Sequence, residues 1–455
     1  MRFDFQCKTG CADQCQPLRC IVTKGRYRLV IAVLLFALGM INYTDRAAVG
    51  ILAPQIQRDL HITPSQLGWV FSAFFFSYAI FAFLGGYLSD KFGPKRTFGV
   101  AVVSWSVFCS LTGAVATLFP LIIVRLFFGA SEGPMNSTTN RMVTNWFPRK
   151  ETARALGFTL SGQNLGSAVA APLVISLGYF FGWRLAFVVL GAIGILWCVL
   201  WLTFASDRPA ESPHVTPEEL AHITSDRSEA ILPKGSAPLR HYILRKSTWG
   251  LALGLFALLY PLYIFVSWMP SYFTNVMHVT PAGLSVAAGV PWIGGFLGYF
   301  LGGFISDLFF KRSENGLKAR KTTTIVPLLL ATITLSAIPS VQSVTAAVAL
   351  FTLSLFALSM ATQSLWAMIH EVTPVIYMGT VGGFIHFLAN MSGVIAPALT
   401  GYVIEHAASG YASAFWIAAA VGLLGVLSIL LLVHNRRIPS HAHSSSVTPL
   451  TTERS

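Results

Sequence analysis

Charged residues are scarce in this sequence, and the few that occur are unevenly placed. Only 11% of the 455 residues are Asp, Glu, Lys or Arg, whereas soluble proteins carry about 25%. This shortage argues against an ordinary soluble enzyme or binding domain. The apolar residues make up 54% of the chain. They fall in blocks of about twenty rather than in the alternation of membrane β-strands. We therefore predict an all-α, polytopic membrane protein.

Acidic residues are fewer than basic ones, 18 against 31, which gives a net charge of +13. Nucleic-acid binding is one explanation, but the Lys and Arg residues gather in alternate loops, as the positive-inside rule predicts. Four of the intervening loops contain no Lys or Arg, and the other two contain one each, Arg58 and Arg184. This distribution predicts twelve spans in the inner (plasma) membrane, with both termini in the cytoplasm.

The expected spans form two sets of six, separated by a polar, proline-containing linker in which we expect a short surface helix. The spans are 28–52, 65–87, 97–116, 119–142, 153–179, 184–205, 248–273, 282–306, 322–340, 343–369, 375–404 and 411–433. The predicted domains are an amino-terminal tail at 1–27, a bundle at 28–205, the cytoplasmic linker at 206–246, a second bundle at 247–434 and a carboxy-terminal tail at 435–455.

Cysteine is also rare, and four of the six cysteines, Cys7, Cys11, Cys15 and Cys20, fall in the amino-terminal tail. Their spacing is compatible with a metal site or an oxidation-sensitive group. We interpret the segment instead as a cytosolic tail, or as residues upstream of the true start. It lacks the apolar core of a secretory signal. No HExxH motif and no paired metal-ligand cluster occurs in a span, so no metal site is predicted.

The first span contains an adjacent acid and base, Asp45 and Arg46. Asp45 follows Leu29 by sixteen residues, which is roughly 24 Å along a helix. A hydrocarbon core is about 30 Å thick, so the pair lies inside the membrane, near its far surface. Charges at such depth normally face a protein interior or a water-filled cavity and are functional. The alternative is that the helix ends at Asn42 and that the pair begins a solvated loop.

The fourth span adds a second acid and base, Arg125 and Glu132, seven residues apart and therefore on one helical face. A purely structural ion pair is the alternative, but two carboxylates and two guanidiniums exceed what one such pair requires. The planar fork of Arg suits a substrate carboxylate. A nearby guanidinium lowers the pKa of a carboxyl group and desolvation raises it. An acid beside a substrate-binding Arg is therefore suited to proton exchange.

A repeated pattern follows the second span of each half. Residues 86–96 and 302–312 both contain glycine, a short apolar stretch, Ser-Asp and a basic pair, as expected for a parallel internal repeat. We predict that Gly86, Asp90, Gly93 and Arg96 form a conformational motif. In it, Asp90 would lie against the positive amino end of a neighbouring helix.

With these motifs the sequence resembles the major facilitator superfamily. The segment 86–96 is similar to the signature loop of that superfamily. Three further motifs resemble the anion:cation symporter family, which includes bacterial D-galactonate, glucarate and hexuronate transporters and animal vesicular glutamate and sialic acid carriers. They are Asn-Tyr-x-Asp-Arg at 42–46, the run from Arg125 to Glu-Gly-Pro at 132–134, and Asn-Trp-Phe-Pro at 145–148. The resemblance implies a monomeric, proton-coupled carrier of organic anions that works by alternating access and needs no cofactor besides protons.

The resemblance also implies roles for individual residues. Asp45 and Glu132 would be the proton-coupling acids, and Arg46 the chief clamp for the substrate carboxylate. The remaining expected substrate-binding residues are Tyr43, Tyr78, Arg125, Gln163, Gln363, Trp366 and Asn390. Gln363 departs from the smaller hydroxyl residue expected at its position, which leaves the substrate open. His386 shares a helical face with Asn390. We interpret it as a neutral hydrogen-bonding group, and a histidine that titrates near neutral pH is the alternative.

We therefore predict import of a small organic anion, such as an aldonate, hexarate or hexuronate, by proton symport. Transport of another carboxylate such as tartrate or an aromatic acid, anion exchange, export and facilitated diffusion are alternatives within the same class. A membrane sensor is disfavoured because the linker is only about forty residues long. An enzyme is disfavoured because the GxSxG pattern at 129–133 lies inside a predicted helix rather than at a strand-to-helix turn.

Overall fold

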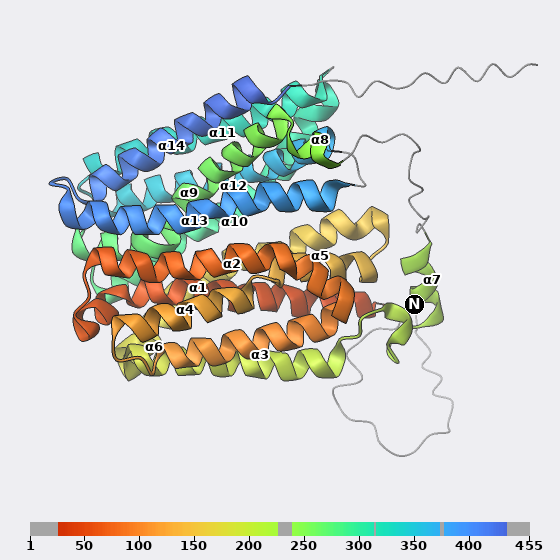
Figure 1. Ribbon diagram of the computed structural model, residues 1–455, viewed down its shortest axis with the longest axis horizontal. Helices are drawn as coiled ribbons and strands as arrows, with labels where there is room; N and C mark the ends of the chain where they lie inside the picture. The colour runs from red at the N-terminus through yellow and green to blue at the C-terminus, as the bar shows by residue number, and fades with distance from the viewer. Residues whose placement is uncertain (1–25, 226–238, 314, 374–376, 435–455) are drawn as a thin grey trace, which may run out of the picture.

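The computed structural model describes residues 26–225, 239–313, 315–373 and 377–434, and regular structure in these ranges is entirely helical (Figure 1). The α-helices are α1 Tyr27–Leu60, α2 Pro64–Phe92, α3 Pro94–Thr112, α4 Leu118–Glu132, α5 Met135–Trp146, α6 Arg149–Phe204, α7 Pro217–Thr224, α8 Leu239–Ile243, α9 Lys246–Asn275, α10 Pro281–Arg312, α11 Gly316–Ala337, α12 Val344–Val372, α13 Met378–His406 and α14 Tyr411–Leu432. Short 3-10 helices occur at Pro209–Glu211 and Ile338–Ser340.

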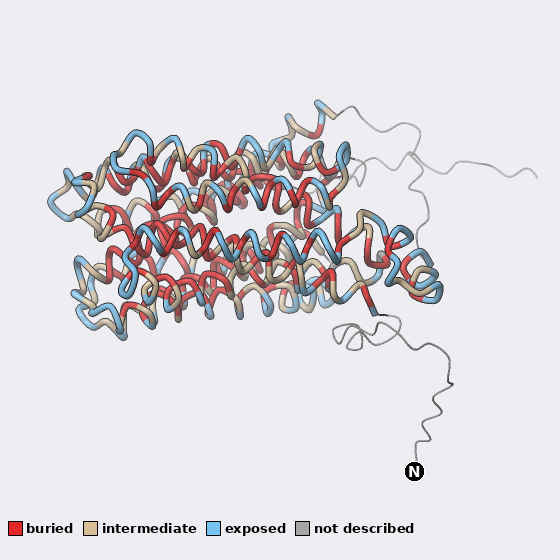
Figure 2. Tube along the Cα trace, turned by 90° about the horizontal axis from the view of Figure 1, so that it is seen from below, coloured by how far each residue is buried: buried red, intermediate tan, exposed pale blue. Residues whose placement is uncertain are grey.

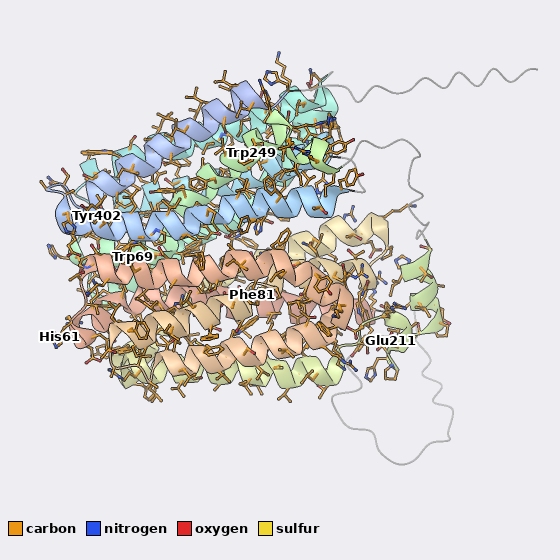
Figure 3. All side chains as sticks on the ribbon, viewed as in Figure 1. His61, Trp69, Phe81, Glu211, Trp249 and Tyr402 are labelled. Atoms are coloured by element: carbon orange, nitrogen blue, oxygen red, sulfur yellow. The ribbon has the colours of Figure 1, made fainter. Side chains whose placement is uncertain are left out.

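The long helices lie side by side in two groups (Figure 1). Helices α1–α6 form the amino-terminal half, and α9–α14 form the carboxy-terminal half. The halves meet where α2 packs on α13, α6 on α10 and α1 on α9. Figure 3 shows His61 and Tyr402 at one end of the molecule and Glu211 at the other, which we call the His61 end and the Glu211 end. Helices α7 and α8 lie at the Glu211 end (Figure 1).

Large apolar side chains cover the outside of both halves. Buried residues face neighbouring helices, while many exposed residues lie on the outer helix surfaces (Figure 2). The most exposed include Phe119, Phe180, Leu196, Phe300, Phe304, Leu424 and Leu431. An apolar outer surface of this extent suits contact with lipid rather than with water. Together with the long apolar helices, it confirms the prediction of an all-α, multi-pass membrane protein.

Ten helices in the described residues are long and apolar enough to cross a membrane. This number differs from the expected twelve for two reasons. Helix α6 contains both the fifth and the sixth predicted spans, joined at Gly182, whose φ of 76° and ψ of 160° are not helical. Helix α3 has 19 residues and lies among the long helices, but it is not one of the ten. The two predicted spans at 153–179 and 184–205 are therefore two helical segments of α6 that meet at Gly182.

The first span is longer than predicted. Helix α1 passes through Asn42 and Pro54 and ends at Leu60, so the alternative that the helix stops at Asn42 is wrong. Proline removes one helical N–H, but helices in membranes tolerate the loss where neighbouring groups satisfy the freed carbonyl. The helix continues for six residues beyond Pro54. The Asp45–Arg46 pair consequently lies well inside a continuous helix.

The fourth predicted span, 119–142, is divided at Gly133–Pro134 into α4 and α5. Pro134 has no N–H to continue the helical ladder. Gly133 also lies against α2, because a Cβ at this position would be 2.5 Å from the Phe81 Cβ. Glu132 is thus the last residue of α4, and Asn136 belongs to the next helix.

The first part of the linker is fastened to the amino-terminal half. As expected it contains a short helix, α7, but this helix is not confined to the surface, because Glu219 is buried. Its carboxylate accepts hydrogen bonds from the backbone N–H of Tyr27 at 2.9 Å and of Arg28 at 3.0 Å. Glu219 therefore caps the amino end of α1, whose own N-cap residue makes no side-chain bond. The tails at 1–25 and 435–455, with Cys7, Cys11, Cys15 and Cys20, lie outside the described residues.

The 86–96 motif is organised differently from the prediction. The exposed carboxylate of Asp90 pairs with Arg141 of α5 at 3.2 Å rather than with a helix end. The amino end of α3 is capped instead by Asp207, which accepts from the Lys95 N–H at 2.7 Å. Gly93 has a φ of 83°, and a Cβ there would lie 2.7 Å from Asp207 Oδ1.

The glycines and Arg96 of this motif also differ in their contacts. A Cβ on Gly85 would be 2.5 Å from the Pro134 Cα, whereas one on Gly86 would reach only Ser137 at 4.0 Å. The close approach to Pro134 is therefore made by Gly85, which is outside the predicted motif. Arg96 is exposed.

Candidate functional site

Four charged side chains are buried together in the amino-terminal half. Asp45 and Arg46 come from α1, and Arg125 and Glu132 from α4. Their exposures are 1%, 4%, 2% and 0%. Charges so deeply buried require partners, because an isolated ion in a low-dielectric interior is strongly unfavourable. The sequence correctly placed these residues away from solvent.

The partners are found between the two helices rather than within one. Arg46 donates from Nη2 to Glu132 Oε2 at 2.9 Å and from Nε to the same oxygen at 3.3 Å. Asp45 interacts electrostatically with Glu132 and Arg125. Consecutive helical residues point about 100° apart, so Asp45 and its neighbour Arg46 face different partners.

Several polar atoms of this cluster have no hydrogen-bond partner among the described residues. They include both carboxylate oxygens of Asp45, Oε1 of Glu132 and Nε of Arg125. Unsatisfied buried polar atoms are rare in folded proteins, and they concentrate where a ligand, water or proton is exchanged. The cluster therefore has more hydrogen-bonding capacity than its own members use.

Aromatic rings enclose both guanidiniums. The Arg46 Cζ lies 4.7 Å from the ring centroid of Tyr43, 4.5 Å from that of Tyr78 and 5.1 Å from that of Phe74. Phe74 also lies 4.7 Å from the Arg125 Cζ, so one ring contacts both cations. The aromatic faces favour a cation and limit the directions from which an anion can approach.

A chain of hydrogen bonds extends from this enclosure toward α6. Asn136 Nδ2 donates to the Tyr78 hydroxyl at 3.3 Å, and Gln163 Nε2 donates to Asn136 Oδ1 at 2.8 Å. The expected substrate-binding residues Tyr78 and Gln163 are thus joined through Asn136. All three are polar groups in the interior of the bundle, where a polyhydroxy ligand could exchange hydrogen bonds with them.

The carboxy-terminal half contributes a second polar group. The Tyr263 hydroxyl donates to Asn390 Oδ1, and Asn390 Nδ2 lies 3.1 Å from Nδ1 of His386. The Trp366 ring lies 5.8 Å from the His386 ring. These contacts bring the expected residues Asn390 and Trp366 together.

Gln363 occupies the same helix as Trp366, and its side chain hydrogen-bonds to Tyr299 of α10. Both Gln363 and Tyr299 are half-buried. Helix α10, which carries Tyr299, packs on α6 of the amino-terminal half, where a Cβ on Gly295 would lie 3.3 Å from Asn164 Oδ1.

The two groups face each other across the interface between the halves. The rings of Phe75 and Tyr263 are 4.2 Å apart. Phe75 lies one helical turn from Tyr78, whose ring contacts the Arg46 guanidinium. One central region therefore contains most of the predicted binding residues. They are Tyr43, Arg46, Tyr78, Gln163, Gln363, Trp366 and Asn390. Arg125 lies behind Phe74, and the four motif residues Gly86, Asp90, Gly93 and Arg96 lie elsewhere, at or near the end of α2.

Sequence reasoning missed Phe74, Tyr263 and Tyr299 as members of this region. Each lies in an apolar helix, where an aromatic residue usually indicates ordinary packing. A tyrosine in the middle of a span was the one available signal, because its hydroxyl needs a partner in lipid. In the described residues no group of three or more His, Cys, Asp or Glu side chains is arranged to hold a metal.

The halves approach most closely toward the His61 end. A Cβ on Gly50 would be 2.4 Å from the Val266 carbonyl oxygen, and one on Gly68 would be 2.7 Å from that of Pro397. The Ser65 N–H donates to Glu405 across the interface at 2.9 Å. The two halves are therefore in direct backbone contact between the central region and the His61 end.

Comparison with known proteins gives a consistent result. Residues 35–397 match the family described as Major Facilitator Superfamily. The hexuronate transporter of Bacillus subtilis (strain 168) is 38% identical over 89% of this chain and 94% of its own length. The D-galactonate transporter of Escherichia coli O6:H1 is 32% identical over 90% of this chain and 96% of its length.

Two solved structures share the fold at lower identity. A bacterial homologue of the human lysosomal transporter Spinster, in an inward-facing and occupied conformation, superposes with a TM-score of 0.72 at 18% identity. The match covers 90% of this chain and 97% of that one. A D-xylose–proton symporter superposes with a TM-score of 0.73 at 15% identity, covering 90% and 98% of the two chains.

Proposed function

Since the chain belongs to the Major Facilitator Superfamily, a family of transporters rather than enzymes, we propose that it imports a sugar acid by proton symport. The observation that carries the proposal is the buried Arg46–Glu132 pair, which lies among hydrogen-bonding side chains from both halves. The relatives named for hexuronate and D-galactonate support a sugar-acid substrate.

Arg46 holds the substrate carboxylate in this proposal. Its guanidinium now donates twice to Glu132, and a carboxylate from the substrate offers the same acceptor geometry. Once the substrate occupies Arg46, Glu132 is left buried without its cation. A buried unpaired carboxylate is strongly unfavourable, so Glu132 takes up a proton. Substrate and proton are thereby bound together.

Asp45 is the second proton-exchanging group. Its carboxylate lies near both Arg125 and Glu132, and it has no hydrogen-bond partner among the described residues. It is therefore placed to pass a proton to or from Glu132 as Arg46 changes its partner. Arg125 offsets the charge of Asp45 while enclosed by Phe74 and Phe128.

In this proposal, transport proceeds by alternating access, in which the contacts between the halves open and close. In this conformation the halves meet closely at Gly50 and Gly68, toward the His61 end. We assign the Glu211 end to the cytoplasm because the basic loops around Lys95 and Lys150 lie there, which matches the positive-inside rule. The protein then sits in the inner (plasma) membrane as a monomer with its external side closed.

Uptake by purified protein in proteoliposomes tests the proposal. Hexuronate or aldonate uptake should rise when an inward proton gradient is imposed. Glu132→Gln should abolish gradient-driven accumulation and spare exchange of internal for external substrate, because the neutral side chain mimics the protonated acid. Uptake that ignores the proton gradient would exclude symport and favour a facilitator or exchanger. Absence of sugar-acid flux would refute the proposal as a whole.

A further inference from the structure

The charged groups of the central region all come from the amino-terminal half. Across the carboxy-terminal half no Asp, Glu, Lys or Arg occurs at 247–306, 322–369, 377–404 or 411–432. These ranges contain nearly the full length of α9, α10, α12, α13 and α14. We propose that this asymmetry makes the transporter selective for sugar acids with a single carboxylate, and that it discriminates against dicarboxylates of the same carbon chain. The inference rests on the proposed sugar-acid transport.

Arg46 is the one cation of the amino-terminal cluster that faces the carboxy-terminal half. Its Cζ lies 4.5 Å from the Tyr78 ring, and Phe75, one turn along the same helix, contacts Tyr263 of that half with ring centroids 4.2 Å apart. Arg125, in contrast, is enclosed by Phe74 and Phe128, with its Cζ 4.7 Å from each ring, and is 2% exposed. It also lies near Asp45. One guanidinium is therefore placed for one substrate carboxylate.

The side chains that meet the other end of the substrate are neutral. They are Tyr263, Tyr299, Gln363, Trp366, His386 and Asn390. His386 Nδ1 lies 3.1 Å from Asn390 Nδ2, and no Asp or Glu occurs within 377–404 of its helix. Hydroxyl, amide and indole groups suit sugar hydroxyls as hydrogen-bond partners, and the Trp366 ring offers a flat apolar face to a sugar ring.

A second carboxylate would meet these neutral groups after losing its water. An ion moved into a closed site without a counter-charge is disfavoured far more than a hydroxyl that finds a hydrogen-bond partner. A hexuronate and a hexarate have the same six carbons and differ at one terminal carbon, which is an aldehyde or ring hemiacetal in the former and a carboxylate in the latter. This pair isolates the contribution of the second charge.

The experiment is competition in proteoliposomes at pH 7. Labelled glucuronate uptake is measured against unlabelled glucuronate and glucarate, and galacturonate and galactarate serve as a second matched pair. We expect each hexarate to need at least a tenfold higher concentration than its hexuronate for half-inhibition. Equal inhibition, within threefold, would overturn this inference and leave sugar-acid transport standing. Inhibition by neither class would instead refute the proposed function.

A variant tests the electrostatic cause. Gln363→Arg adds a cation to the neutral half, and it should lower the ratio of hexarate to hexuronate half-inhibition toward one. Gln363→Met removes the amide without adding charge, so it should weaken hexuronate and hexarate binding alike and leave their ratio at tenfold or more. An unchanged ratio in Gln363→Arg that elutes as a monodisperse peak would show that charge is not the cause. If the variant fails to fold, the ratio measured with the unmodified protein still decides the proposal.

Discussion

Replacement of Arg46 by lysine separates its geometry from its charge. The guanidinium presents Nε and Nη2 together to one carboxylate, as the bonds of 3.3 and 2.9 Å to Glu132 show. A lysine ammonium keeps the positive charge but forms one such bond in place of two. A hydrogen bond to a charged group is worth about 1.5–3 kcal/mol. Sugar-acid affinity should therefore fall roughly ten- to 150-fold, since about 1.4 kcal/mol corresponds to tenfold.

Lysine is a cleaner probe than alanine at this position. Glu132 is fully buried, and Arg46→Ala would leave it without a cation at a cost of about 3–5 kcal/mol in stability. Isothermal titration of the purified protein with hexuronate measures the affinity directly. Arg184→Lys is the matched control, because Arg184 is exposed and pairs with Asp59 near the His61 end. If the affinity of Arg46→Lys for hexuronate is within threefold of that of the unmodified protein, the two-bond geometry of the guanidinium is not needed for binding.

Three further outcomes are expected. Gly50→Ala should hold α1 away from α9, because its Cβ would lie 2.4 Å from the Val266 carbonyl oxygen. Distances between spin labels placed across the His61 end should therefore lengthen. The control Gly157→Ala, whose Cβ would have nothing within 4 Å, should leave these distances unchanged. Glu219→Gln should lower the free energy of unfolding by about 1–2 kcal/mol, because it weakens the cap of α1. The thermal unfolding midpoint in detergent should fall. The exposed control Glu211→Gln should leave that midpoint unchanged. Asp90→Asn should change the free energy of unfolding by less than about 1 kcal/mol in the same assay, because its pair with Arg141 is exposed. A larger loss would show that Asp90 stabilises the fold by more than a surface ion pair does.

The sequence was sufficient to predict the fold class and the membrane-buried charges. Long apolar runs are a direct consequence of the lipid environment. The depth of Asp45 and Arg46 followed from counting helical residues. The resemblance identified further polar residues, of which Tyr78, Gln163 and Asn390 lie in the central region in the structure.

Which residues pair between different helices could not be predicted from the sequence. Helical spacing predicts which residues share a face of one helix, but the Arg46–Glu132 bond depends on how α1 and α4 are rotated against each other. The capping of α3 by Asp207 joins residues over 100 positions apart in the chain, and no local pattern indicates it. The division at Gly133–Pro134 is the exception, because a proline within a predicted span is itself a signal that the helix is interrupted.

The buried cluster of two acids and two bases has a consequence for the membrane potential. When all four groups are ionised, the positive charges of Arg46 and Arg125 equal the negative charges of Asp45 and Glu132. A charge moved through the full field gains or loses about 2.3 kcal/mol per 100 mV. The empty transporter therefore reorients without electrical work on this cluster. Binding of one monoanion together with one proton also leaves the net charge of the site at zero. Uptake at that stoichiometry therefore depends on the concentration gradients of proton and anion alone. Only a second proton would make uptake depend on the membrane potential.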